Sequence, residues 1–420
     1  MRFFTGLDLL QMTLDKHKNR RKIKMKYKMC QIMLFAAAMA MALPISVGVA
    51  SAESVTIGIP LPLSGNLKKF GMMMKNSFEM AQATINEAGG INGRPVNIVF
   101  ADDEGKVVSV KPAFDKLVAA KPVMLVGGYA SDPTYLMANL SQDKDMPFLI
   151  STASADKITQ KGWKNIYRLN PPISEYTKGL EDFLVNRIKP ESMAIIYENS
   201  MFGTNGAMSM TEFCYAQAIE IRAQIDYDIE TITPAYFRSL LAPLTEEPPD
   251  VIYMISYLED AVMLVQQIRD LKFKSLLIGG AGGFTLKEFV QKAGQSANYL
   301  LTVSLWSEHV LYSGAKEYFT QYVKRYGNSP SYHGAEAYSA LIVASDALKR
   351  AKSFNPENIR EALNETYLIT PFAPVKFYSY EDFERQNSIN TLVLQIIDGK
   401  FETVWPPELA SAPFILPGRD

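Results

Sequence analysis

The stretch that decides the fold runs from Pro122 to Thr134 and reads Pro-Val-Met-Leu-Val-Gly-Gly-Tyr-Ala-Ser-Asp-Pro-Thr. Its apolar part, 123–126, predicts a buried strand, and a helix-like segment at 134–142 follows the Gly-Gly turn. Asp132 directly before Pro133 predicts a helix N-cap with proline at the first helical position. A buried strand that leads through a short turn into a helix is the repeating unit of an α/β protein.

The same unit recurs in both directions along the chain. Nearly continuous apolar runs separated by helical segments indicate mostly parallel sheets with helices on both faces, and the whole pattern predicts two α/β lobes of similar size. Strands are expected at 55–59, 96–100, 148–150, 193–197, 218–223, 251–255, 275–279, 299–305 and 390–397, and helices at 78–85, 113–120, 175–187, 312–326 and 336–351.

Residues 1–52 have the residue order of a secretory signal peptide. A basic run from Lys16 to Lys28 precedes an uncharged stretch that ends in Ala50-Ser-Ala52, a small-residue cleavage signal. We therefore expect cleavage after Ala52 and a soluble mature protein. The uncharged stretch is also long enough to span a bilayer, so an uncleaved membrane anchor is the alternative, and Met25 and Met29 are alternative start positions.

Charge and cysteine content exclude some classes of protein. The chain has 43 basic and 44 acidic residues, and the part after residue 52 keeps 34 and 42, a net charge of −8. An acidic chain without a basic stripe argues against a nucleic-acid partner. Cys214 is the one cysteine after residue 52, so we expect no internal disulfide.

Sequence signals for an enzyme are weak. The chain has no Gly-x-Ser-x-Gly elbow, no phosphate-binding loop and no His-Glu-x-x-His motif, and only two histidines follow residue 52. The run Gly279-Gly-Ala-Gly-Gly283 follows a predicted strand but lacks the spacing of a dinucleotide fingerprint. We expect a protein that is not an enzyme and that holds neither a metal ion nor a cofactor.

Small hydroxyl residues follow two successive predicted strands. Ser131 comes after the strand at 123–126, and Thr152 and Ser154 come after the strand at 148–150. Ligands of open α/β sheets bind beyond the carboxyl ends of the strands, where hydroxyls and free backbone N–H groups suit a carboxylate. Turn and cap chemistry could explain each residue alone, but their joint placement favours a ligand site.

A family resemblance extends this interpretation. The segment Ile57-Gly-Ile-Pro-Leu-Pro-Leu-Ser-Gly65, followed by Phe70-Gly71 and Ala88-Gly-Gly-Ile-Asn-Gly93, resembles the N-terminus of periplasmic leucine/isoleucine/valine-binding proteins, and the similarity continues over nearly all of 54–400. The resemblance implies a two-lobed type I periplasmic binding fold with three hinge crossings. On this basis the N-terminal lobe would comprise 53–172 and 302–373, and the C-terminal lobe 173–301 and 374–420.

The resemblance also implies a function. A periplasmic, monomeric protein would capture a branched-chain or other amino acid, or a related carboxylate or amide, between its lobes by hinge closure. It would then deliver the ligand to the membrane permease of an ABC transporter. The alternative is a ligand-sensing receptor domain for aromatic or aliphatic carboxylates that lack an amine.

Site residues are carried over from the resemblance. Ser131, Thr152 and Ser154 would bind the ligand carboxylate. The acidic residue that meets the ammonium of amino-acid ligands falls on Ala281, which carries no charge, and Glu175 near the lobe junction is the candidate substitute. The family's first-lobe disulfide is missing, because its positions lie near Gly105 and Ala130. The aromatic positions fall on Phe70, Phe202, Tyr257 and either Tyr332 or His333.

Overall fold

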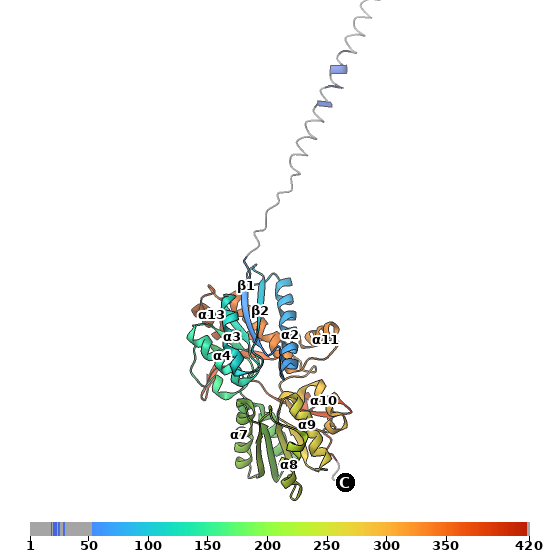
Figure 1. Cartoon of the computed structure of the whole chain (residues 1–420). Coiled ribbons are helices and arrows are strands. Elements are labelled where there is room, and N and C mark those ends of the chain that lie inside the picture. Colours follow the sequence, from blue (N-terminus) through green and yellow to red (C-terminus); the bar gives the residue numbers. More distant parts are fainter. Residues whose placement is uncertain (1–17, 19, 23, 26–27, 30–52, 418–420) are drawn as a thin grey trace, which may run out of the picture. The chain divides into compact units, whose positions relative to one another are not determined.

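The computed structural model describes residues 18, 20–22, 24–25, 28–29 and 53–417 (Figure 1). The chain divides into two compact units, Met1–Ala52 and Glu53–Asp420. Most of the predicted signal peptide, with its cleavage position at Ala52, lies outside the described residues. Within the described part of the chain, no helix has the length and apolarity needed to cross a membrane.

Two seven-stranded sheets organise the unit Glu53–Asp420, one in each lobe. The first sheet has the order β13(Tyr378–Tyr380), β14(Phe383–Gln386), β5(Ile166–Arg168), β4(Phe148–Ile150), β3(Met124–Gly127), β1(Val55–Leu61) and β2(Val96–Asp102). The second has the order β16(Lys400–Trp405), β15(Leu392–Ile397), β10(Leu301–Ser304), β9(Leu276–Gly279), β8(Val251–Ile255), β6(Ser192–Glu198) and β7(Glu220–Tyr227). A two-stranded sheet joins β11(Tyr367–Ile369) and β12(Pro374–Lys376).

The two large sheets repeat one strand order, so that β1, β3 and β4 of the first correspond to β6, β8 and β9 of the second. These strands pair in parallel, and β3 and β8 are buried along their whole length. Their continuous apolar sequences follow from this burial, because helices cover both faces of a parallel sheet. One difference lies at the far side, where β14 runs parallel to β5 but β15 runs antiparallel to β10.

Helices flank both sheets in Figure 1, with α2, α3, α4 and α13 beside the first and α7 to α10 beside the second. The α-helices are α2(Lys68–Glu87), α3(Val107–Ala119), α4(Ser131–Asp143), α5(Ile173–Tyr176), α6(Lys178–Phe183), α7(Met201–Ala216), α8(Pro234–Leu241), α9(Leu258–Asp270), α10(Lys287–Ala293), α11(Ala315–Tyr326), α12(Tyr332–Arg350) and α13(Pro356–Asn364). Short helical turns are η1(Asp156–Ile158), the π-turn η2(Leu184–Ile188), η3(Ala242–Thr245), η4(Gly282–Thr285), η5(Gly294–Ala297) and η6(Pro407–Leu409).

Three crossings connect the lobes, as expected, but the strand pairing differs from two predicted boundaries. The strand β10 pairs with β9 and β15, so the chain leaves the second sheet after Ser304 rather than at 302. The strands β13 and β14 belong to the first sheet, so the last crossing follows Gln386 rather than 373. Short strands such as these carry too few residues to reveal their sheet from sequence.

One predicted local feature is wrong, and a second is refined. Asp132 is not the N-cap of α4, because the helix begins at Ser131 and its N-cap is Ala130, which makes no side-chain cap bond. The predicted helix at 175–187 is confirmed as a helical segment, but it is divided into α5, α6 and a π-turn, η2. The Asp132 carboxylate instead accepts a hydrogen bond from the backbone N–H of Met201, in the other lobe.

The first and third crossings are fastened to each other. Gln386 Nε2 donates to the Asn170 carbonyl at 2.7 Å, and Asn387 Nδ2 donates to the Leu169 carbonyl at 3.0 Å. Ser388 Oγ donates to Glu175 Oε2 at 3.0 Å. The first two bonds are buried, and together the three bonds hold the two crossing segments side by side.

Candidate ligand-binding site

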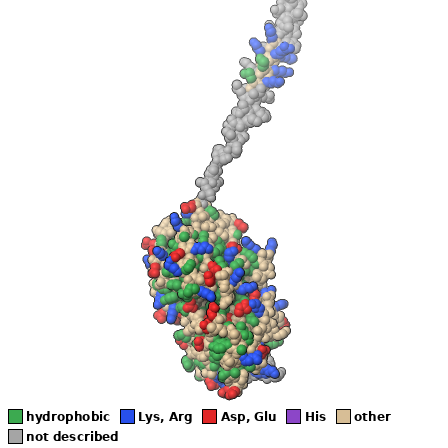
Figure 2. Space-filling view, viewed as in Figure 1, with side chains coloured by type: hydrophobic (Ala, Val, Ile, Leu, Met, Phe, Trp, Pro, Cys, Tyr) green, Lys and Arg blue, Asp and Glu red, His purple; other side chains and the backbone are tan. Residues whose placement is uncertain are grey.

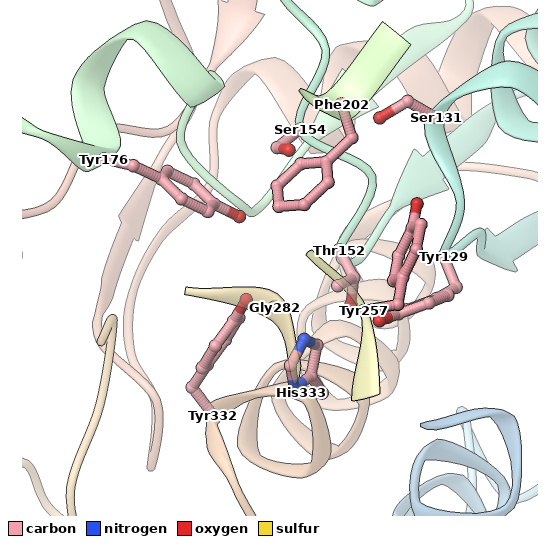
Figure 3. A pocket seen from close by; sticks show the side chains of 10 residues that line it. All are labelled: Tyr129, Ser131, Thr152, Ser154, Tyr176, Phe202, Tyr257, Gly282, Tyr332 and His333. Carbon is pink, nitrogen blue, oxygen red and sulfur yellow. The ribbon is translucent and has the colours of Figure 1, made fainter. Parts of the chain in front are cut away.

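A small cavity lies where the C-terminal ends of strands from both sheets meet (Figure 3). Its volume is about 20 Å³, which is room for roughly one water molecule. A ligand of amino-acid size therefore enters only when the lobes or the lining side chains move. Ten residues line the cavity: Tyr129, Ser131, Thr152, Ser154, Tyr176, Phe202, Tyr257, Gly282, Tyr332 and His333.

The first lobe contributes the small hydroxyls of the cavity. Ser131 is the first residue of α4, and its Oγ accepts a hydrogen bond from the backbone N–H of Ala155 at 3.1 Å. This bond ties the turn after β3 to the turn after β4, so that Thr152 and Ser154 face the same space as Ser131. All three side chains are buried, which makes their hydroxyls costly to leave unpaired and strong when paired with an anion.

The second lobe contributes aromatic rings and backbone. Phe202 lies in the first turn of α7, and its ring centroid is 5.7 Å from that of Tyr257, which precedes α9. Gly282 brings backbone close to these rings, because a Cβ there would lie 2.7 Å from the Ser256 carbonyl and 3.4 Å from Phe202. This side of the cavity can cover an apolar body, and Gly282 leaves room for close approach.

The start of α12 provides Tyr332 and His333, which Figure 3 shows on the side of the cavity opposite Ser131 and Ser154. The two rings stack with centroids 3.8 Å apart. Burial lowers the pKa of His333 to about 3, so its imidazole is neutral at physiological pH. Its Nδ1 lies 2.8 Å from the hydroxyl of Ser331. A neutral ring here offers hydrogen bonding and stacking without a positive charge.

Seven of the ten residues predicted from sequence line this cavity, and both alternatives at 332 and 333 are among them. Phe70 lies behind the lining, where its ring stacks on Tyr129 at 4.7 Å and meets His333 edge-on at 5.0 Å. Ala281 is fully buried next to the lining residue Gly282. It has φ +66° and ψ −140°, a conformation that residues other than glycine rarely adopt.

Glu175 does not reach the cavity lining. Its Oε1 accepts from the Lys178 ammonium at 2.9 Å and its Oε2 accepts from Ser388 at 3.0 Å. Both oxygens are therefore used at the hinge, and the geometry gives Glu175 no free oxygen for a ligand ammonium.

Sequence reasoning missed three lining residues: Tyr129, Tyr176 and Gly282. Tyr129 stands two residues before Ser131 in the strand-to-helix turn, and its position there was a signal that could have found it. Tyr176 lies in a one-turn helix at the first crossing, where its hydroxyl accepts from Asn170 Nδ2 at 2.6 Å. Tyr176 reaches the cavity because the crossing packs against the lobes, so no local sequence pattern could have predicted its position.

Polar contacts join the two lobes at the mouth of the cleft. Asp132 Oδ2 accepts a hydrogen bond from the backbone N–H of Met201, the first residue of α7, at 3.0 Å. The Lys106 ammonium lies 3.4 Å from Glu230 Oε1. A carboxylate at a helix N-terminus is favourable because the first N–H groups of a helix have no partner within it. Asp132 therefore caps a helix of the opposite lobe instead of its own.

Comparisons with known proteins agree with this geometry. A family model described as periplasmic binding protein matches residues 54–399. The chain belongs to this family. Among curated members of the periplasmic binding protein family, the chain is 25% identical over 369 residues to "Leu/Ile/Val-binding protein homolog 7" of Brucella melitensis, covering 84% of this chain and 92% of that one. It is 26% identical over 367 residues to "Leu/Ile/Val-binding protein homolog 8" of the same organism, with 83% and 90% covered.

Solved structures of periplasmic binding proteins share the fold. The substrate-binding protein LivJ from Streptococcus pneumoniae, in complex with isoleucine, superposes with a TM-score of 0.76 at 23% identity, covering 84% of this chain and all of that one. A solute-binding protein of an ABC transporter from R. palustris, in complex with benzoate, gives a TM-score of 0.76 at 17% identity, with 86% and 97% covered. Both confirm the two-lobed type I architecture expected from sequence.

Proposed function

We propose that this periplasmic binding protein is the solute-capturing component of an ABC transporter and that its ligand is an amino acid or a related small carboxylate or amide. The cavity between the lobes carries the proposal, because buried hydroxyls from one lobe face aromatic rings from the other. The two curated relatives bear names of leucine/isoleucine/valine binding, and LivJ holds isoleucine.

The mechanism is hinge closure. Ser131, Thr152 and Ser154 of the first lobe hold the ligand carboxylate, and Phe202 and Tyr257 then cover its apolar part as the lobes close. The contacts at the mouth of the cleft hold the closed form. The protein acts as a periplasmic monomer, releases its ligand chemically unchanged to a membrane permease, and needs no cofactor. Export through the predicted signal peptide, with cleavage after Ala52, belongs to the same proposal.

Acidic and basic side chains are interspersed over the face seen in Figure 2. In the described residues no group of three or more His, Cys, Asp and Glu side chains is placed to hold a metal ion. We therefore place recognition in the cavity between the lobes and propose no nucleic-acid partner.

A second candidate is binding of aromatic or aliphatic carboxylates without an amine, for sensing or for transport. The ring-rich lining favours it, since six of the ten lining residues are Tyr, Phe or His. The structural neighbour from R. palustris holds benzoate. Both candidate ligand classes carry a carboxylate for the hydroxyls to bind. They differ in the rest of the ligand, because only an amino acid carries an amine.

A thermal-shift panel tests the function. A ligand that binds only the folded state stabilises it by about 2.7 kcal/mol at one hundred times its dissociation constant. We expect at least one of L-leucine, L-isoleucine, L-phenylalanine, benzoate, 4-methylpentanoate and isobutyramide to raise the melting temperature. The recovered compound should be unchanged by mass spectrometry. A flat response to all six, or turnover of any of them, would contradict the proposed function.

A further inference from the structure

Glu336 is a buried acid for which the proposed function has so far given no role. It lies in α12, three residues after His333 and four after Tyr332, and its side chain is fully buried. Residues at these spacings share one face of a helix, so Glu336 lies one turn below the two rings of α12 that line the cavity. Neither of its carboxyl oxygens makes a hydrogen bond of normal geometry within residues 53–417.

The polar groups around Glu336 belong to the cavity. The hydroxyl of Thr152, from the turn after β4, is close enough to stabilise the charged form of Glu336 and so lowers its pKa in part. Tyr176 lies in α5, and Tyr332 lies in α12 with Glu336. The negative charge of Glu336 contributes to raising the pKa of both tyrosines. All three residues line the cavity. Glu336 therefore interacts with cavity-lining residues from three elements, one of which is its own helix.

Other buried acids near the cleft already have partners. Glu175 accepts from Lys178 and Ser388. Glu198 accepts from the backbone N–H groups of Ser200 at 2.8 Å and Gly203 at 2.9 Å. The same holds for Asp260, whose Oδ2 accepts from the Tyr227 hydroxyl at 2.7 Å and from the Tyr257 N–H at 3.1 Å. Glu336 differs from these three because both of its oxygens lack such a bond.

The chemistry of an α-amino acid fits this position. Its carboxylate and ammonium are attached to the same carbon, so an acid that meets the ammonium must lie within a few ångströms of the groups that hold the carboxylate. Glu336 interacts with the side chain of Thr152, one of the proposed carboxylate-binding hydroxyls. Ala281 cannot do this, since it has only a methyl group, and a buried ammonium without an acid would be costly.

We propose that Glu336 is the acidic partner of a ligand ammonium and that it selects ligands with a primary amine next to their carboxylate. The inference rests on the proposed function and narrows its ligand class to amino acids. Glu336 thus acts from the first lobe, together with the hydroxyls, rather than from the second lobe at the position of Ala281.

Binding then moves a proton. Burial raises the pKa of Glu336 well above its usual range, and no Lys or Arg pairs with it in the described part of the chain. The polar groups that interact with it are Thr152, Tyr176 and Tyr332, and His333 on the same helix is neutral. A buried carboxyl without a cation beside it favours its protonated form. When a ligand ammonium arrives, the carboxyl O–H proton is released to solvent and a carboxylate–ammonium pair forms.

Calorimetry in two buffers of different ionisation enthalpy tests the inference at pH 7. The probes are two matched pairs, L-leucine with 4-methylpentanoate and L-phenylalanine with 3-phenylpropanoate. We expect the protein to bind an amino acid of one pair with release of up to one proton per ligand. Glu336→Gln should weaken that binding at least tenfold and abolish the proton release, while binding of the amine-free partner changes less than about threefold.

Glu175→Gln serves as the matched control and should leave proton release unchanged, because that residue lies at the hinge. The melting temperature of Glu336→Gln separates a folding defect from a binding defect, and we expect no decrease. Preference for the amine-free members, binding without proton release, or equal weakening of both members by Glu336→Gln would overturn the inference while leaving the proposed function intact. If neither these probes nor the six compounds of the thermal-shift panel bind, the proposed function itself fails.

Discussion

The turn after β4 and the turn after β9 occupy equivalent places in the two lobes but differ in chemistry. The first reads Ser151-Thr-Ala-Ser154 and presents hydroxyls, whereas the second reads Gly280-Ala-Gly-Gly283 and presents backbone. The cavity is lined by Thr152 and Ser154 from one turn and by Gly282 from the other. Equivalent turns thus differ in function: the first offers hydroxyls that can bind a polar group, and the second lets the backbone approach a ligand closely.

A second equivalent pair shows what the lobes share. Phe70-Gly71 lies in the first turn of the helix after β1, and Phe202-Gly203 lies in the first turn of the helix after β6. In both places the backbone passes so close to a carbonyl oxygen that a Cβ on the glycine would lie 1.8 Å from it. Yet Phe70 is covered by Tyr129, while Phe202 lines the cavity. The two glycines have the same structural role in both lobes, whereas only the phenylalanine of the second lobe lines the cavity.

The largest expected effect comes from breaking the shared feature. Gly71→Ala would press a methyl group against the Pro62 carbonyl, and Gly203→Ala against the Glu198 carbonyl. Because both obstacles are backbone, we expect each change to lower the free energy of unfolding by about 3 kcal/mol or more. Chemical denaturation measures this, with Met208→Ala, at an exposed position of α7, as the control. If either alanine variant kept full stability, the two turns would not be equivalent.

Removing a hydroxyl of the first lobe should have a smaller effect, and that effect should be on ligand affinity. Ser131→Ala and Ser154→Ala should each weaken binding of a carboxylate ligand by about 1–3 kcal/mol, since a buried anion loses a donor. Ser131→Ala should also lower stability slightly, because the N–H of Ala155 loses its acceptor. Calorimetric titration measures the affinities.

Ser141→Ala is the control for both serine variants, since Ser141 is a buried serine of α4, the helix that Ser131 begins, and lies outside the cavity lining. It should leave affinity unchanged. If Ser131→Ala, Ser154→Ala and the parent protein bound the ligand equally well, these hydroxyls would not belong to the site. The proposed difference between the lobes would then be wrong.

The smallest effect concerns the contact that joins the lobes. Asp132→Ala removes the acceptor of the Met201 N–H and should weaken ligand binding by about 1 kcal/mol, mainly through faster dissociation. Stopped-flow fluorescence would measure the dissociation rate. Asp115→Ala removes an exposed carboxylate that pairs within α3, and it should have no effect. A slower dissociation from Asp132→Ala would show that the contact opposes closure.

Sequence predicted the fold well where a pattern is local and long. The apolar runs at 148–150 and 251–255 coincide with β4 and β8, because buried parallel strands leave a continuous apolar signature. Strands β13 and β14 were missed and their lobe was misassigned, since each has only three or four residues and is defined by its partner. The role of Asp132 was also wrong, because its acceptor function is set by a helix of the other lobe.

The candidate site was predictable where residues suited to a ligand follow the ends of strands. Ser131, Thr152 and Ser154 follow strands that sequence reveals, so their meeting could be foreseen. Glu336 could not be found in this way, because an acid in the middle of a helix usually faces solvent. Its burial depends on how α12 packs on the first sheet, which no local signal encodes.

The central claim, that ligand binding closes the two lobes, is tested most directly by a distance measurement across the cleft mouth. Val108→Cys in α3 and Thr231→Cys, next to Glu230, place spin labels on either side of the Lys106–Glu230 pair, and the one described cysteine, Cys214, is buried. We predict that adding a ligand found by the thermal-shift panel shifts the distance distribution to shorter values. An unchanged distribution at saturating ligand would contradict closure.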